Sequence, residues 1–144
     1  MHLPLWFILV VIYEIKHFIA DFPLQGRYML GKFRPDWGFV LPLLAHVGVH
    51  ACGTFLITIF LVSWKTALCL ALFDGTAHFI MDRIKAGPKY LGRYKALTAE
   101  TFKTATPKQI KGNTFFWWSL GLDQGFHNFT HATIILWCLT HLGQ

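Results

Sequence analysis

Aspartate and histidine recur four residues apart along this chain. Side chains at positions i and i+4 lie on one face of an α-helix, so each such pair can act on a single target. With five Asp and eight His among 144 residues, random placement gives about one such pairing when matches to the template are counted. The chain has six, in four segments: His17/Asp21, His46/His50, Asp74/His78/Asp82 and Asp123/His127/His131.

A divalent metal ion explains why the two residue types occur together. Imidazole nitrogens and carboxylate oxygens suit zinc, manganese and iron(II), of which zinc is favoured here. The three cysteines stand far apart in apolar runs, so neither a thiolate site nor a disulfide framework is indicated. Paired ligands on rigid helix faces are also the device of metalloprotease helices and di-metal bundles. The predicted metal ligands are His17, Asp21, His46, His50, His78, Asp82, Asp123 and His127.

Other polar residues near the same helix faces are expected to support this site. Asp74 is predicted to be a general base or a carboxylate that orients the ligands. Asp74 and His131 bring the candidates to ten, more than the roughly four to six ligands of one ion, so one or two ions are expected and two are favoured. A solvated helix end, a snorkelling side chain or helix packing is the ordinary alternative for such positions. The residues predicted to orient ligands or hold substrate are Glu14, Gln25, Lys85, Gln124 and His131.

Four apolar runs must position these residues in a chain that is 54% hydrophobic. The runs cover about 3–21, 39–62, 65–82 and 115–140, close to the roughly 20 residues that a membrane-spanning helix needs. An aspartate at the centre of a lipid-facing helix costs about 2.5–3.5 kcal/mol, so the polar faces must meet inside a bundle. The sequence therefore predicts an all-α integral membrane bundle of four transmembrane helices. It forms a single domain over 1–144, with a basic cytoplasmic loop at 83–113.

The basic residues predict how the bundle is oriented. Of the 13 Lys and Arg, 11 fall in the connections 22–38 and 83–111, whereas the turn on the opposite side holds only Lys65. Because cytoplasmic loops carry the excess of Lys and Arg, both termini are expected outside a bacterial-type inner membrane. The same distribution makes membrane lipid the expected partner and argues against nucleic acid despite the net charge of +6. The expected interfacial tryptophans are Trp37, Trp117 and Trp118 inside, and Trp6, Trp64 and Trp137 outside.

The motifs, taken as a set, resemble a known family. They are His17-x-x-x-Asp21-Phe22-x-Leu24-Gln25, His46-x-x-x-His50, His78-Phe79-x-x-Asp82-x-x-Lys85 and Asp123-Gln124-x-x-His127. In these the chain resembles the domain of unknown function 3307 family of small bacterial and phage membrane proteins. The resemblance covers the whole hydrophobic frame and brings no assigned activity with it. More distantly, the chain is similar to the membrane-bound metal-dependent hydrolases of bacteria, an analogy that does not settle function.

Three kinds of function fit these expectations. The leading hypothesis is a metal-dependent membrane hydrolase, because a metal-bound water becomes a nucleophile near neutral pH. Its substrate would be an amide, ester or phosphoester of a lipid or lipid-linked molecule at the inner leaflet. One alternative is a divalent-metal transporter, for which four short helices offer little machinery unless they form a homodimer. The other is a non-enzymatic small subunit that binds haem or another pigment, or scaffolds a larger membrane complex.

Overall fold

The computed structural model describes residues 3–86 and 104–142, and every regular element in this part of the chain is a helix. The expected all-α fold class is therefore confirmed. Besides four long helices, the described residues contain two 3-10 helices between the first and second of them and one short helix before the last. The elements are α1 (Leu5–Asp21), η1 (Met29–Phe33), η2 (Trp37–Phe39), α2 (Val40–Thr58), α3 (Trp64–Ala86), α5 (Pro107–Lys111) and α6 (Thr114–Thr140).

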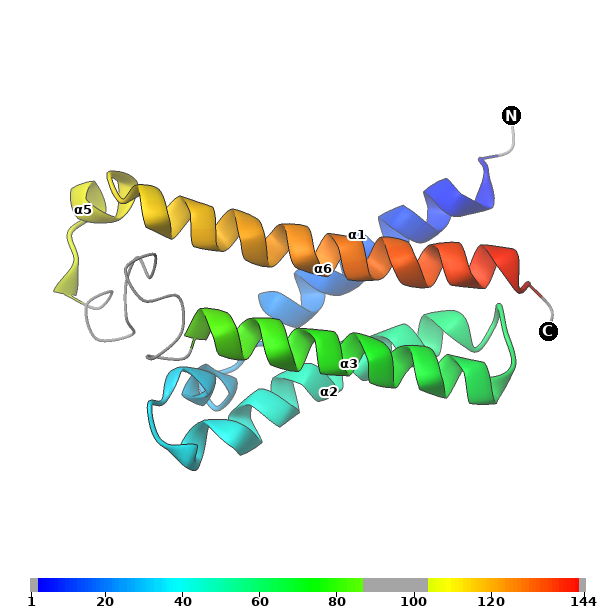
Figure 1. Ribbon diagram of the computed structural model, residues 1–144, viewed down its shortest axis with the longest axis horizontal. Coiled ribbons are helices and arrows are strands. Elements are labelled where there is room, and N and C mark those ends of the chain that lie inside the picture. Colours follow the sequence, from blue (N-terminus) through cyan, green and yellow to red (C-terminus); the bar gives the residue numbers. More distant parts are fainter. Residues whose placement is uncertain (1–2, 87–103, 143–144) are drawn as a thin grey trace.

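The four long helices form a closed ring. α1 packs against α2, α2 against α3, α3 against α6, and α6 against α1. Successive long helices run in opposite directions, so η1, η2 and α5 gather at one end of the bundle (Figure 1). We call this the basic end. The α2–α3 turn at residues 59–63 lies at the opposite end, together with the start of α1 and the end of α6, and we call this the turn end.

Side-chain caps determine where helices begin at the basic end. Asp36 Oδ1 accepts a hydrogen bond from Gly38 N at 2.8 Å at the start of η2. Asn113 Oδ1 accepts one from Phe116 N at 3.1 Å at the start of α6. Such caps satisfy backbone N–H groups that have no partner within the helix. Both helices therefore start at defined points, which sets the depth of the histidines that follow in α2 and α6.

Two expected boundaries differ from the structure. α3 continues to Ala86 instead of ending at 82, because Arg83 and Lys85 lie in its last turn, where the helix dipole favours positive charge. The Arg83 guanidinium also lies 3.5 Å from the centroid of the Phe39 ring. α2 ends at Thr58 instead of 62, and the expected basic loop also contains α5. Residues 87–103 of that loop lie outside the described residues.

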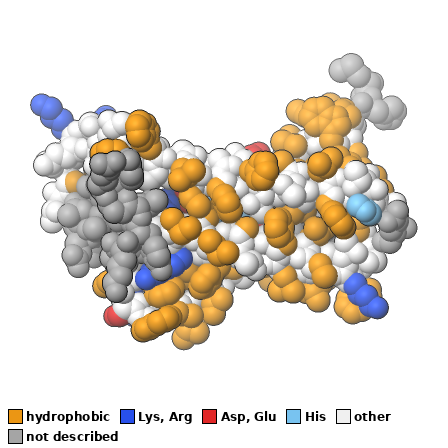
Figure 2. Space-filling view, in the orientation of Figure 1, with side chains coloured by type: hydrophobic (Ala, Val, Ile, Leu, Met, Phe, Trp, Pro, Cys, Tyr) orange, Lys and Arg blue, Asp and Glu red, His pale blue; other side chains and the backbone are white. Residues whose placement is uncertain are grey.

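The helices bury polar side chains and expose apolar ones. Large apolar side chains stand outward along all four long helices, and Figure 2 shows them spread over one face of the molecule. A soluble protein rarely exposes so large an apolar surface, and it seldom fills its interior with charged groups. The buried acidic and imidazole residues are His17, His46, His50, Asp74, His78, Asp82, Asp123, His127 and His131.

An apolar cluster fills the bundle at the turn end. It includes Leu9 of α1, Val62 beside the α2–α3 turn, and Ala67 of α3. Ile134 and Cys138 of α6 complete the contact across the ring, and both are buried. The polar interior therefore lies between this cluster and the basic end.

One helical stretch of the described residues, Trp37–Thr58, is long and apolar enough to cross a membrane by length and composition. α1 has 17 residues and carries Glu14, Lys16 and Asp21. α3 and α6 are longer, but their inward faces carry the carboxylates and imidazoles that lower their mean hydropathy. The expected four-span membrane bundle therefore stays a prediction.

Candidate metal centre

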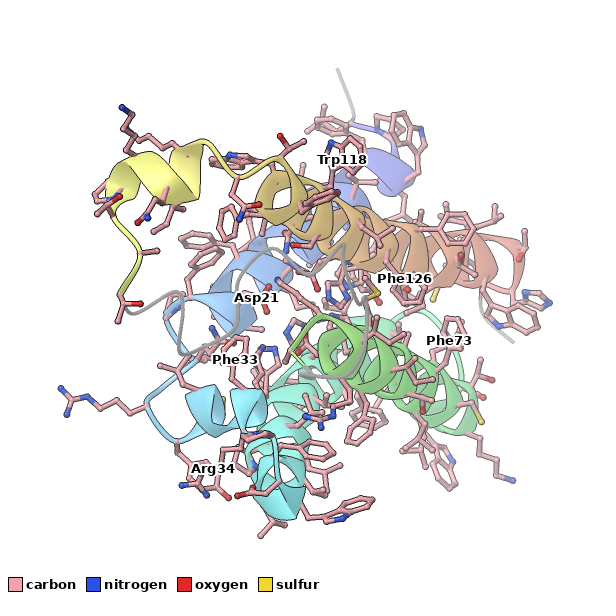
Figure 3. All side chains as sticks on the ribbon, turned by 60° about the vertical axis from the view of Figure 1, so that its left-hand side comes forward. Asp21, Phe33, Arg34, Phe73, Trp118 and Phe126 are labelled. Carbon is pink, nitrogen blue, oxygen red and sulfur yellow. The ribbon has the colours of Figure 1, made fainter. Side chains whose placement is uncertain are left out.

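The structure brings the eight predicted ligands together inside the bundle. They come from all four long helices, and seven are buried while Asp21, labelled in Figure 3, is half-buried. Metal ligation itself stays a prediction. With His131, which was expected only to support the site, they form three groups whose ligand atoms lie within 4.8 Å of one another. The groups are His17/His78/His131, Asp21/His46/His50 and Asp82/Asp123/His127.

Imidazole rings connect the three groups. The centroid of the His78 ring lies 3.9 Å from that of His50 and 4.0 Å from that of His127. The centroid of the His17 ring lies 5.2 Å from that of His127 and 5.4 Å from that of His131. The three groups therefore form one continuous polar interior.

Asp21 is surrounded by imidazoles. His17 Nε2 and His50 Nε2 lie 3.1 and 3.0 Å from its carboxylate oxygens, and His46 Nε2 lies at 3.4 Å. Asp21 is the last residue of α1, so its carboxylate is presented at the basic end of the interior. One carboxylate among three imidazoles is a donor set that suits zinc or iron(II).

The group at Asp82 and Asp123 contains two carboxylates, each paired with a lysine. Lys32 Nζ donates to Asp82 Oδ2 at 3.0 Å, and Lys85 Nζ donates to Asp123 Oδ2 at 2.5 Å. His127 Nε2 lies 3.3 Å from Asp123 Oδ1 and 4.0 Å from Asp82 Oδ1. Each lysine bonds to Oδ2 of its aspartate, which leaves Oδ1 of both aspartates on the side of His127 Nε2. A cation could therefore bind between these oxygens and the imidazole.

Asp74 lies deeper than the other aspartates. Its side chain is fully buried, and Oδ2 accepts from Lys16 Nζ at 2.7 Å and from Thr54 Oγ1 at 2.6 Å. Its Oδ1 lies 3.1 Å from His78 Nδ1. A general base must reach the substrate or a water next to it, whereas these contacts direct Asp74 at protein groups. Of its two predicted roles, the geometry favours orienting the ligands.

His78 has the arrangement typical of a metal-binding histidine. Its Nδ1 lies between the carbonyl oxygen of Asp74 at 2.9 Å and the Asp74 carboxylate, and this fixes the ring. Its Nε2 is buried without a hydrogen-bond partner, and His78 is one of the group with His17 and His131. Metal-bound histidines are commonly held in this way at the nitrogen that does not bind the metal.

Unpartnered polar atoms are frequent in this interior. Among the described residues, ten buried side-chain nitrogen and oxygen atoms have no hydrogen-bond partner, and seven of the ten are histidine nitrogens. Folded proteins leave few such atoms, because each costs about 1–3 kcal/mol. The donor set therefore fits a bound cation, whose coordination would satisfy several of these atoms at once.

Two lysines of the site were missed by the sequence reasoning. The stem of Lys16 passes Gly53 of α2, where a Cβ would lie 3.0 Å from Lys16 Cγ, and its Nζ lies 3.2 Å from His131 Nε2. The position of Lys16 in an apolar run was a usable indication, because ionisable residues inside membrane helices usually serve function. Lys32 is 6% exposed, and its partner Asp82 lies 50 positions away, so spacing gave no indication of it.

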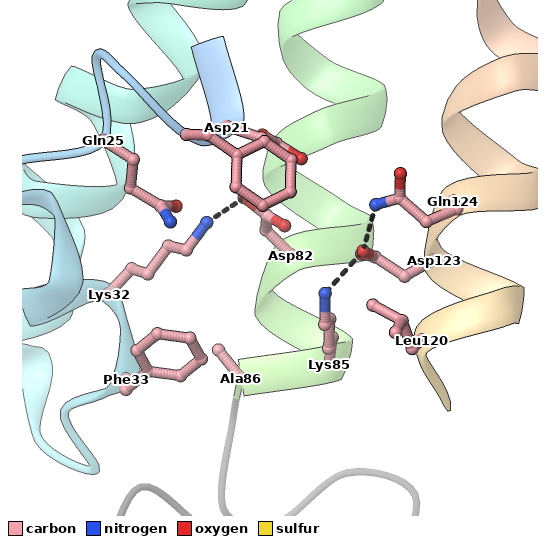
Figure 4. Close-up of a pocket in the computed structure, with 11 residues that line it drawn as sticks. Asp21, Gln25, Lys32, Phe33, Asp82, Lys85, Ala86, Leu120, Asp123 and Gln124 are labelled. Atoms are coloured by element: carbon pink, nitrogen blue, oxygen red, sulfur yellow. Dashed lines mark hydrogen bonds and ion pairs between the residues drawn. The ribbon is translucent and has the colours of Figure 1, made fainter. Parts of the chain in front are cut away.

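A pocket of about 160 Å³ lies at the basic end between η1, α3 and α6 (Figure 4). At about 30 Å³ per molecule, this is the space of roughly five waters. Carboxylates from two of the three ligand groups reach it, so an ion bound there would be accessible to small molecules. Its polar lining consists of Asp21, Gln25, Lys32, Asp82, Lys85, Asp123 and Gln124.

Three of the five expected supporting residues lie at this pocket, while His131 lies among the ligands. Gln25 and Lys85 line it, and Gln124 Nε2 also donates to Asp123 Oδ2 at 3.2 Å. Glu14 is exposed and lies outside all three groups. The reason is helical geometry. Tyr13 and His17 are buried, lie four residues apart and define the inward face of α1, and Glu14 lies to one side of this face.

Fold and site together define a small helical bundle with a buried histidine–aspartate cluster that opens at its basic end. A family model described as "Protein of unknown function (DUF3307)" matches residues 8–141, and the chain belongs to this family. No curated protein and no solved structure matches the chain. Function must therefore be argued from the site itself.

Proposed function

We propose that this protein is a membrane-embedded four-helix bundle that binds one or two divalent metal ions and uses them for hydrolysis. Zinc is the favoured ion, and the substrate is an amide, ester or phosphoester of a lipid or lipid-linked molecule. The observation that carries the proposal is the geometry of His78. Its ring is fixed through Nδ1 by Asp74, its buried Nε2 has no hydrogen-bond partner, and the residue is grouped with His17 and His131.

The membrane location is supported by the distribution of apolar side chains. Apolar residues face outward along all four long helices, where acyl chains would solvate them, and the ionisable residues face one another. Six exposed tryptophans stand near the two ends of the bundle, as in the aromatic belts of membrane proteins. They are Trp37, Trp117 and Trp118 at the basic end, and Trp6, Trp64 and Trp137 at the turn end.

The orientation follows from the basic residues. Arg27, Arg34, Lys108 and Lys111 belong to connections or short helices at the basic end, whereas Lys65 starts α3 at the turn end. Under the positive-inside rule the basic end faces the cytoplasm, and both termini lie outside. The pocket would then open at the level of the inner leaflet.

Hydrolysis is supported by the combination of ligands and pocket. A metal ion held at Asp21 or Asp82 would border a pocket with room for several waters, and a bound metal makes such water a nucleophile near neutral pH. The apolar cluster around Leu9 and Ile134 fills the turn end of the interior. A mouth at one end suits an enzyme, whereas a transporter must open the same site to both sides of the membrane.

Elemental analysis of the full-length protein in detergent tests metal binding. We expect one or two zinc ions per chain, and we expect His78→Ala to lose at least one of them. His141→Ala is the matched control, because His141 lies past the end of α6 and outside the three groups. A wild-type protein without metal, or equal losses in the two variants, contradicts the proposal.

Hydrolysis and transport are then separated by two assays on the metal-loaded protein. We expect chelator-sensitive cleavage of at least one class among lipid amides, esters and phosphoesters presented in mixed micelles. Metal uptake into proteoliposomes without any such cleavage would favour the transporter. A strong visible absorption band from a bound pigment would favour the non-enzymatic subunit.

A further inference from the structure

We propose that the pocket at the basic end recognises the phosphate group of an ester once the metal is bound. This proposal rests on the proposed metal site. It narrows the proposed substrates, which are amides, esters and phosphoesters, to molecules that carry a phosphate group. The phosphate oxygens would bind the metal together with the side chains of Lys32 and Lys85.

The two lysines reach the pocket from different elements. Lys32 comes from η1 and Lys85 from the last turn of α3, and Figure 4 shows their ammonium groups pointing towards Asp82 and Asp123. Both ammonium groups bond to aspartates of a single ligand group. The pocket between them, at about 160 Å³, has room for one phosphate group.

The charge of this lining depends on metal. Three carboxylates and two ammonium groups leave one net negative charge when the imidazoles are neutral. One divalent ion reverses this to one positive charge, and two ions give three. Metal loading therefore turns the pocket from a site that attracts cations into one that attracts anions.

The lysines also need a new partner when metal binds. A cation bound to Asp82 and Asp123 would neutralise the carboxylate charge that stabilises the two ammonium groups. Lys32 is 6% exposed, and a largely buried charge without an anionic partner is costly. A phosphate dianion supplies acceptor oxygens to both lysines, and the Gln25 and Gln124 amides beside them can donate as well.

The rim of the pocket suits an amphiphile. Phe22, Phe33 and Leu120 line it next to the polar groups, and the Phe22 side chain is largely exposed. The glycerol and acyl parts of a phospholipid would lie on this apolar rim. Free phosphate and a lipid phosphate would contact the same polar side chains of the pocket, but only the lipid would also contact the apolar rim.

Calorimetric titration of inorganic phosphate into the full-length protein in detergent tests the proposal. We expect the zinc-loaded protein to bind phosphate and the metal-stripped protein to bind it at least about tenfold more weakly. Lys32→Met and Lys85→Met should each weaken binding to the zinc-loaded protein by about tenfold, the effect of losing one charge-assisted hydrogen bond. Zinc content should be retained in both variants, because neither lysine is a ligand. Lys65→Met, at the turn end, is the matched control and should bind phosphate as the wild type does.

The outcomes separate this proposal from the one on which it rests. A wild type that binds no zinc overturns both. A zinc-loaded wild type that does not bind phosphate, or binds it equally without zinc, overturns only the phosphate site. If Lys32→Met fails to fold, Lys85→Met decides alone, because the Lys85 side chain is 30% exposed and tolerates substitution. Lys85→Arg should restore most of the affinity, and an Arg variant as weak as Met would contradict a charge-assisted contact.

A short-chain phosphatidic acid and the matching neutral diacylglycerol distinguish the two sources of phosphate. Tighter binding of the phosphatidic acid than of inorganic phosphate assigns the site to a lipid headgroup. Equal binding of the two assigns it to a soluble phosphate ester. Neutral diacylglycerol that binds as tightly as phosphatidic acid contradicts phosphate recognition.

Discussion

The interior of the bundle has two halves that use the same residue types in different ways. In the deep half, Asp74 is enclosed by Lys16, Thr54 and His78 and is fully buried. In the pocket half, Asp82 and Asp123 each bond to a lysine with one oxygen and line a cavity. Under the proposed function, an Asp–His pair at i, i+4 would orient ligands where it is enclosed and would bind exchangeable ions where it has room.

Substitution of the deep aspartate should have the largest effect. Asp74→Ala leaves the Lys16 ammonium buried without its carboxylate, and we expect a loss of about 3–5 kcal/mol in the free energy of unfolding. Denaturant titration of the detergent-solubilised protein, followed by circular dichroism, measures this. The double variant Lys16→Met/Asp74→Leu removes both charges and should recover much of the loss. A single variant as stable as the double one would contradict an ion pair in the deep half.

Substitution of a pocket aspartate should affect metal before stability. Asp21→Asn keeps the shape of the side chain but removes the negative charge of a predicted ligand that lies 3.0 to 3.4 Å from three imidazoles. We expect zinc affinity at this group to fall about 100-fold or more, as loss of even an indirect partner costs 10- to 100-fold. Competition with a zinc chelator measures the change. Asp36→Asn is the control, because Asp36 caps η2 outside the cluster and asparagine caps equally well.

Removal of a pocket lysine should have a smaller effect of the opposite sign. Lys85 would compete with a bound metal for Asp123, and its side chain is 30% exposed, which screens the ion pair. We therefore expect Lys85→Met to raise zinc affinity by at most about fivefold. The same chelator competition measures it. Weaker zinc binding in this variant would mean that the lysine supports the metal site instead of competing with it.

Glu14 should have no measurable effect on the metal. Glu14→Gln alters an exposed side chain outside the three ligand groups, so zinc content and affinity should equal those of the wild type. The stability change should stay within about 0.5 kcal/mol, as for most surface substitutions. A loss of zinc in this variant would show that the inward face of α1 is wider than Tyr13 and His17 indicate.

The sequence predicts local relations well and long-range partners poorly. His17/Asp21 and Asp123/His127 follow from helical spacing alone, and the structure keeps each pair on one face. Lys32 and Asp82 are paired through the packing of η1 against α3, which no periodicity encodes. Glu14, three residues before His17, lies beside the buried face of α1 and not on it, which the spacing alone did not indicate. The pairing of Lys16 with Asp74 needed the position of α2 beside α1, where Gly53 leaves space for the lysine stem.

Anomalous X-ray scattering from crystals of the full-length protein, measured at the zinc edge, tests the central claim most directly. The account predicts a peak inside the bundle, about 2.0–2.2 Å from imidazole nitrogens and carboxylate oxygens of the three groups. An interior with no anomalous peak, in which these histidines and aspartates bond only to one another and to lysine, would contradict it.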